Sequence, residues 1–334
     1  MTDFIDAPLI NLIITRIYTI VAALIISIPI GMLQSKTAAA PLPPFWLGLN
    51  KVFLAKLIKL NVEKRTDHDL FFRGLFVVCF FICVSALLVI ALNFLPAVSA
   101  DIHFLQIAIL AFSISTISPF LLNKAIQAQL TKTGKLTTTL EAKLSICTMR
   151  ALSNADNSGI NRSLIHYTVY SFIRHLIAPI LFFLIGGLPL LIISTLFLWL
   201  TYAIGKTSLS GAYTYTITLF EELLSIIPNF IGTTLIVMAT FITPKASFKT
   251  ALHALSLKHS GHLMPGVHPL AITAYAINIS IGGKEKSRYG ATIDRPWYGP
   301  KDAKAKVDSA QVKLAQYMIV IAQLLGLFAL MVFL

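Results

Sequence analysis

Long runs of apolar residues, separated by polar and charged stretches, dominate this chain. A helix that crosses a bilayer needs about 20 mostly apolar residues in succession. Runs of this kind cover residues 9–33, 70–95, 102–122, 164–185, 188–204 and 314–334. The fourth and fifth runs meet at Gly186-Gly187-Leu188-Pro189, a sequence typical of a turn between antiparallel helices. The pattern predicts an all-α integral membrane protein, with residues 1–334 forming one polytopic domain of about six transmembrane helices.

A seventh apolar run, residues 217–243, differs from the others in its polar content. It contains Glu221, Glu222, Pro228 and Asn229. Carboxylates and amides are costly in hydrocarbon unless they face protein or water. We therefore predict that residues 217–243 form a re-entrant or interfacial helix.

Composition and charge support a membrane protein. Of the 334 residues, 56% are apolar and only 12% are charged, and the mean hydropathy is +0.79. Soluble domains carry about 25% charged residues. This composition excludes an ordinary soluble enzyme, a disordered chain and a nucleic-acid-binding domain, so no nucleic-acid partner is expected.

The basic residues are concentrated in three segments between the apolar runs. Residues 34–69 contain six Lys or Arg, residues 123–163 contain six, and residues 244–313 contain eleven, out of 27 in the whole chain. Cytoplasmic loops of membrane proteins carry an excess of Lys and Arg. We therefore predict a multi-pass protein with these three large basic loops in the cytoplasm, where anionic lipid headgroups are expected partners.

Three groups of residues could carry chemistry. The adjacent acids Glu221 and Glu222 could hold Mg²⁺ or perform acid–base work, or could simply begin a helix whose dipole favours acids. Arg174 and His175 lie inside an apolar run, and ionisable groups at membrane depth usually face a cavity or a partner.

The third group is a glycine-rich basic segment near the C-terminal end. Glycines permit close backbone approach to a ligand, and cationic side chains hold phosphate. The candidate binding residues are Gly282, Gly283, Lys284, Arg288, Tyr289 and Arg295. The alternative is a turn-rich loop lying against anionic headgroups. The upstream His259, His262 and His268 are interpreted as polar loop residues rather than a metal site, because their spacing is irregular and no carboxylate lies nearby.

Several segments, in order along the chain, resemble the cobalamin-biosynthesis CobD/CbiB family. They are FFRGLFVV, LEAKLSICTMRAL, NRSLIHYTVYSFIRHLIAPILFFLIGGLP, FEELLSIIPNFIGTTLIVMATFITP and AITAYAINISIGGKEKSRYGATIDRPWYGP. The resemblance implies a bacterial inner-membrane adenosylcobinamide-phosphate synthase. Such an enzyme joins aminopropanol, or its phosphate, to the corrinoid adenosylcobyric acid in an ATP-dependent amide ligation. It also implies Mg²⁺ and ATP as cofactors, with Glu221 and Glu222 on the metal and the glycine-rich basic segment on phosphate or corrinoid.

The chain also departs from the family pattern. Arg150-Ala151 stands where the family has Arg-Asp, Arg174-His175 stands where it has Glu-Asn, and Thr201 ends a segment where it has Asp. Arg174 and His175 are therefore catalytic candidates only if a cation replaces the missing Glu–Asn pair. The alternative is a catalytically inactive relative, similar to AmpE-like inner-membrane proteins around FIRHLIAPILFFLIGG, which acts as a sensor or accessory protein with other membrane proteins as partners.

Overall fold

The computed structural model describes residues 7–37, 41–60, 65–94, 99–153, 155–204, 211–257, 268–286, 292–303 and 306–332. The described chain is helical with one small sheet, which confirms the all-α prediction. Its elements are α1 (Ala7–Lys36), α2 (Pro44–Leu49), the π-helix η1 (Asn50–Leu54), α3 (Ala55–Leu60), α4 (Asp67–Phe94), α5 (Ser99–Ser113), α6 (Ser118–Thr133), α7 (Thr138–Thr148), α8 (Asn157–Phe172), the π-helix η2 (Ile173–Ile177), α9 (Ala178–Ile204), α10 (Gly211–Ile242), α11 (Phe248–Ser256), α12 (His268–Ala276), β1 (Ile281–Lys286), β2 (Thr292–Tyr298) and α13 (Ser309–Met331).

Six helical stretches of the described chain are long and apolar enough to cross a membrane. They are Ile10–Lys36, Asp67–Ala91, His103–Thr133, Asn157–Ala203, Ala212–Ile242 and Ser309–Met331. The number agrees with the prediction. The predicted spans 164–185 and 188–204 both fall in the stretch Asn157–Ala203, on either side of a break at Gly187, and residues 217–242 of the segment predicted to be re-entrant or interfacial belong to α10. By length and composition, the chain is therefore a multi-pass membrane protein.

The stretch from α8 to α9 doubles back at Gly187. This residue has φ 63° and ψ −152°, a conformation that divides α9 and that favours glycine. The ring of Trp46 lies 4.6 Å from His175 and 5.2 Å from Tyr202, which precede and follow the break. At the break itself, the Arg16 guanidinium of α1 lies against Gly187 and donates to the carbonyls of Leu184 and Ile185, at 2.7 and 2.9 Å. Arg16 thus satisfies carbonyl groups that the end of the helix leaves without intrahelical partners.

Helix α10 is one helix of 32 residues with Pro228 inside it, and it is long and apolar enough to span a membrane. Its first turns pack closely on α4, where a Cβ at Gly74 would clash with the backbone carbonyl of Tyr213. The Tyr213 hydroxyl donates to the carbonyl of Leu57 at 3.1 Å. Small residues at such contacts let two helix backbones approach in a membrane.

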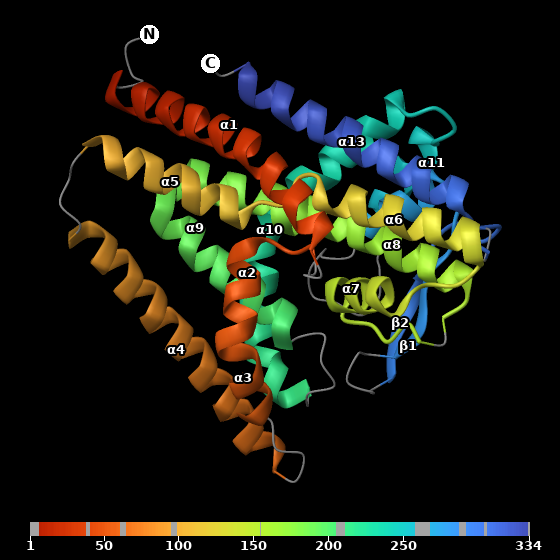
Figure 1. The fold of residues 1–334 in the computed structure, drawn as a ribbon, viewed down its shortest axis with the longest axis horizontal. Coiled ribbons are helices and arrows are strands. Elements are labelled where there is room, and N and C mark those ends of the chain that lie inside the picture. Colours follow the sequence, from red (N-terminus) through yellow and green to blue (C-terminus); the bar gives the residue numbers. More distant parts are fainter. Residues whose placement is uncertain are drawn as a thin grey trace.

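Helices α7 and α11 and the strands β1 and β2 lie at the end of the bundle away from the start of α1 and the end of α13 (Figure 1). There β1 and β2 pair antiparallel, with Gly283 opposite Arg295 and an irregularity between Ile281 and Gly283. The hairpin is tied to the helices because the amide of Ala151 donates to the carbonyl of Lys286, at 2.9 Å. This sheet falls in a segment that the sequence predicted to be loop.

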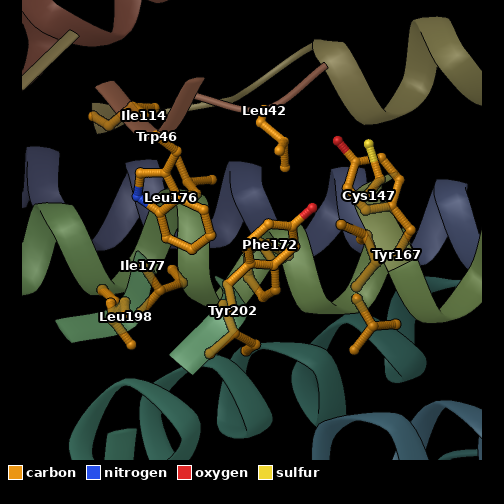
Figure 2. Close-up of a cluster of buried hydrophobic side chains, with 14 of the residues drawn as sticks. Leu42, Trp46, Ile114, Cys147, Tyr167, Phe172, Leu176, Ile177, Leu198 and Tyr202 are labelled. Atoms are coloured by element: carbon orange, nitrogen blue, oxygen red, sulfur yellow. The ribbon is translucent and has the colours of Figure 1, made fainter. Parts of the chain in front are cut away.

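The buried core lies where α2 meets the doubled-back α8–α9 stretch. Figure 2 shows Trp46, Phe172, Leu176 and Tyr202 among the side chains of this cluster. Trp46 and Trp199 are buried almost completely, and the Trp199 indole donates to the Asn50 amide oxygen at 3.0 Å. A buried tryptophan N–H normally needs such a partner. The core thus holds in place the segment that carries Arg174 and His175.

Candidate functional site

Arg174 forms a buried ion pair with Glu221, which joins two residues that the sequence singled out separately. Arg174 lies in η2 and Glu221 in α10, and their side chains are 9% and 18% exposed. The guanidinium also donates to the Ser225 hydroxyl and lies 5.6 Å from the ring of Tyr170. Its charge is therefore balanced by one carboxylate and further stabilised by an aromatic face.

The polar side chains around this pair are spaced by four residues on each helix. Glu221, Ser225 and Asn229 follow one another along α10, and Tyr170 precedes Arg174 by one helical turn. Residues four apart lie on the same face of a helix. Ser225 and Asn229 are both buried. The ion pair is thus the centre of a polar seam, which we define as Tyr170, Arg174, Glu221, Ser225 and Asn229.

The π-helix η2 sets the direction of these side chains. Insertion of such a wide turn into a helix is frequent at functional sites, because it re-aims the residues within it. The carbonyl of His175 accepts a hydrogen bond from the amide of Ser115 at 2.9 Å, so this part of the helix is fixed by a neighbouring segment.

His175 has a different environment from that of Arg174. Its side chain is fully buried, its Nδ1 lies 2.9 Å from the Ser171 hydroxyl, and Trp46 contacts its ring edge-on. These contacts are those of a packed core histidine. The catalytic role that the sequence assigned to Arg174 and His175 stays a prediction, and Arg174 contacts one of the predicted metal residues, Glu221.

The Glu221–Glu222 pair does not have the surroundings that Mg²⁺ requires. Magnesium is bound by one or two carboxylates together with water and phosphate oxygens. Here the Glu221 carboxylate already faces the Arg174 guanidinium, and Glu222 is half-buried next to it. Within the described ranges, no three His, Cys, Asp or Glu side chains are grouped closely enough to share a metal ion. A divalent cation at Glu221 would meet a resident positive charge, so these residues do not fit the metal.

The predicted phosphate-binding residues lie in and around the β1–β2 hairpin. Gly282 and Gly283 have φ of 132° and 88°, Lys284 is exposed, and Arg295 lies opposite Gly283 in the register. Arg288 and Tyr289 lie outside the described residues, as do His259 and His262, whereas His268 begins α12.

The hairpin also contains a contact that sequence reasoning missed. The ring of Trp297 lies so close to Gly283 that a Cβ there would clash with it, and the Arg162 guanidinium lies 5.6 Å from the same ring. Trp297 is 57% exposed. The signal for this contact was a glycine in one strand and an aromatic residue in the next, an arrangement that pairs across sheets.

Comparison with known proteins decides the family. The model of the family described as CobD/Cbib protein matches residues 20–317. The chain belongs to the CobD/CbiB family. No curated protein and no solved structure matches the chain.

The CobD/CbiB match covers most of the chain and includes both candidate sites, from within α1 to the first turns of α13. The family resemblance inferred from the ordered segments is therefore confirmed. The protein is a CobD/CbiB-family membrane protein, of the family associated with cobalamin biosynthesis.

Proposed function

We propose that this CobD/CbiB-family protein is a non-catalytic member that acts as a sensor or accessory component of the bacterial inner membrane. The observation that carries the proposal is the Arg174–Glu221 ion pair. A synthase that consumes ATP needs carboxylates free to hold Mg²⁺ against the phosphates. Here the Glu221 carboxylate, which would serve this role, is paired with Arg174, and Arg174 itself stands where the family has an acid.

The other departures from the family pattern act in the same direction. Ala151 and Thr201 stand where the family has aspartates, so two further negative charges are missing. Thr201 is buried, and its hydroxyl donates to the carbonyls of Phe197 and Leu198, both at 3.1 Å. A hydroxyl used in this way inside its own helix does not replace a carboxylate ligand.

A second candidate function is the family reaction itself, the ATP-dependent ligation of aminopropanol or its phosphate to a corrinoid. The observation that favours it is the retained glycine hairpin with Lys284 exposed beside Gly283, inside the matched range. Backbone with positive φ and a neighbouring cation suits phosphate. In that case the nucleotide or corrinoid phosphate would be held without the help of Glu221.

Titration of the purified, detergent-solubilised protein with ATP, with and without Mg²⁺, separates the two functions. The proposal expects no Mg²⁺-dependent heat of binding and no Mg²⁺-dependent stabilisation by ATP, from a sample with a cooperative unfolding transition. A bacterial strain defective in cobinamide amidation should also remain uncomplemented. Mg²⁺-dependent ATP binding that disappears in Lys284→Gln, together with complementation, would contradict the proposal and establish the ligase.

A further inference from the structure

Residues at the end of α10 and on one face of α11 form an exposed apolar surface. We define the α11 patch as Phe241, Ile242, Phe248, Leu252 and Leu255, which are 78%, 55%, 37%, 43% and 45% exposed. The rings of Phe241 and Phe248 lie 5.7 Å apart, so the two helices contribute to one continuous surface. Contiguous apolar patches on a protein surface mark sites of contact with membrane or another protein.

The sequence of α11 places its residues on three distinct faces. Phe248, Leu252 and Leu255 recur at i, i+4 and i+7 and form the exposed apolar face. Ala251 and Ala254 are fully buried and form the face that packs on the protein. The remaining side of the helix carries polar residues that include Lys249 and His253, both exposed.

Hydrogen bonds hold α11 in this orientation. The amide of Ser247 donates to the carbonyl of Ala276 at 2.8 Å, and the Thr250 hydroxyl donates to the carbonyl of Tyr275 at 2.9 Å. The Ser247 side chain caps the helix by accepting from the amide of Thr250. Helix α11 therefore cannot turn its apolar face inward without losing these bonds.

The charged residues beside the α11 patch are basic. Lys245 and Lys249 flank it and are both exposed, and residues 223–284 contain neither Asp nor Glu. An amphipathic helix with basic residues beside its apolar face is typical of one that lies in the headgroup region of a bilayer. Anionic lipid attracts Lys and Arg near the membrane surface.

We propose that α11 is an interfacial helix that inserts the α11 patch into the bilayer surface, with Lys245 and Lys249 on anionic lipid headgroups. The patch is continuous with α10, a helix long and apolar enough to span the membrane, so the lipid that surrounds α10 extends directly onto α11. The segment 244–257, predicted to be part of a cytoplasmic loop, thereby becomes a membrane-bound element. It places the level of the bilayer surface at the end of the bundle that carries the β-hairpin.

Two adjacent spin labels on the full-length protein test this placement. In a background with Cys79→Ala and Cys83→Ala, Leu252→Cys places a label on the patch and His253→Cys places one on the polar face. Cys147 stays because it is buried. In vesicles of phosphatidylcholine and phosphatidylglycerol, the label at 252 should collide several-fold more with oxygen than with a water-soluble nickel chelate. The label at 253 should show the opposite preference.

Two results would overturn the proposal. Equal access of the nickel chelate to both labels would place α11 in water. Protection of the label at 252 from both reagents would mean that protein covers the patch, as in a second copy or a partner subunit.

Lipid charge is tested with the same label at position 252. The depth of this label should increase when phosphatidylglycerol is added to phosphatidylcholine vesicles. The increase should disappear in the double variant Lys245→Gln and Lys249→Gln. It should persist in the matched control Lys51→Gln and Lys56→Gln, which removes the same charge from two exposed lysines elsewhere. An equal loss of the response in both double variants would contradict specific headgroup contact by α11.

Discussion

Removal of one partner of the Arg174–Glu221 ion pair should destabilise the protein far more than removal of both. In Glu221→Leu, the Arg174 guanidinium keeps its contacts with Ser225 and Tyr170 but loses the carboxylate that pairs with it. An uncompensated buried charge costs about 3 kcal/mol of the free energy of unfolding. Arg174→Met leaves the Glu221 carboxylate in the same position and should cost a similar amount.

The double variant Arg174→Met with Glu221→Leu removes both charges and fills the space with apolar atoms. Replacement of a buried ion pair by packed hydrophobic residues is close to neutral. With about 3 kcal/mol for each single variant and about zero for the double variant, the double-mutant cycle should give a coupling energy of about 6 kcal/mol, well above the roughly 0.5 kcal/mol that separates coupled from additive sites. Equilibrium unfolding in mixed micelles, with a denaturing detergent as the variable, measures each free energy.

Asp69 provides a matched control at an exposed position. Its carboxylate lies 3.3 Å from Arg73 and 3.6 Å from Arg65, and its side chain is 38% exposed. Exposed ion pairs contribute at most about 1 kcal/mol, so Asp69→Asn should have a small effect. Additive effects of the Arg174 and Glu221 substitutions, or stabilisation by Mg²⁺ that Glu221→Gln abolishes, would refute the interpretation of Glu221 as a residue committed to Arg174.

Three further predictions concern single positions. Gly187→Ala should lower the free energy of unfolding by about 1–3 kcal/mol, because φ 63° with ψ −152° lies in a region open essentially to glycine alone; detergent unfolding measures it, and an unchanged midpoint would contradict a turn at this residue. Gly283→Ala should shift the fluorescence emission of Trp297, whose ring occupies the space of the new methyl group; an unshifted spectrum would place the ring elsewhere. Burial raises the pKa of Cys147 to about 12 from 9.0, so N-ethylmaleimide at pH 8 should modify it only after unfolding. Since the unfolded thiol loses its proton first, the contribution of Cys147 to stability is constant below pH 9 and falls from there toward pH 12; a flat profile in this range, after subtraction of that of Cys147→Ala, would contradict the shift.

The signals that succeeded in the sequence were local ones. The Gly-Gly-Leu-Pro segment marked the break because glycine alone adopts the φ of Gly187 without strain, and this depends on no distant residue. The helical fold followed from runs of apolar residues in the same way. The strands β1 and β2 were missed because glycines and a proline lie within them, and such residues favour turns in a local analysis.

The signals that failed depended on contacts between distant segments. Glu221 was treated as a group that hydrocarbon would reject, and Arg174 as a separate anomaly, because nothing in either helix shows that the two meet. The spacing of Glu221, Ser225 and Asn229 by four residues was nevertheless visible and indicates one polar face on α10. In α11, the period of Phe248, Leu252 and Leu255 was equally visible but fell within a segment interpreted as a cytoplasmic loop because of its many Lys and Arg residues.

The Arg174–Glu221 ion pair explains how α10 can carry an acid and still span a membrane. It also explains why the site does not support the family chemistry. An acid inside a membrane helix is tolerated when it lines a water-filled cavity or when the protein supplies a cation. A catalytic Glu221 would have to line a water-filled cavity and direct its charge at Mg²⁺. Instead, the protein supplies a cation, Arg174, and the two charges cancel. A Mg²⁺–ATP complex carries net negative charge and would gain no attraction from such a neutral pair. The residue that makes Glu221 compatible with the membrane therefore also removes it from metal binding, and the double-mutant cycle with Mg²⁺ titration tests both consequences together.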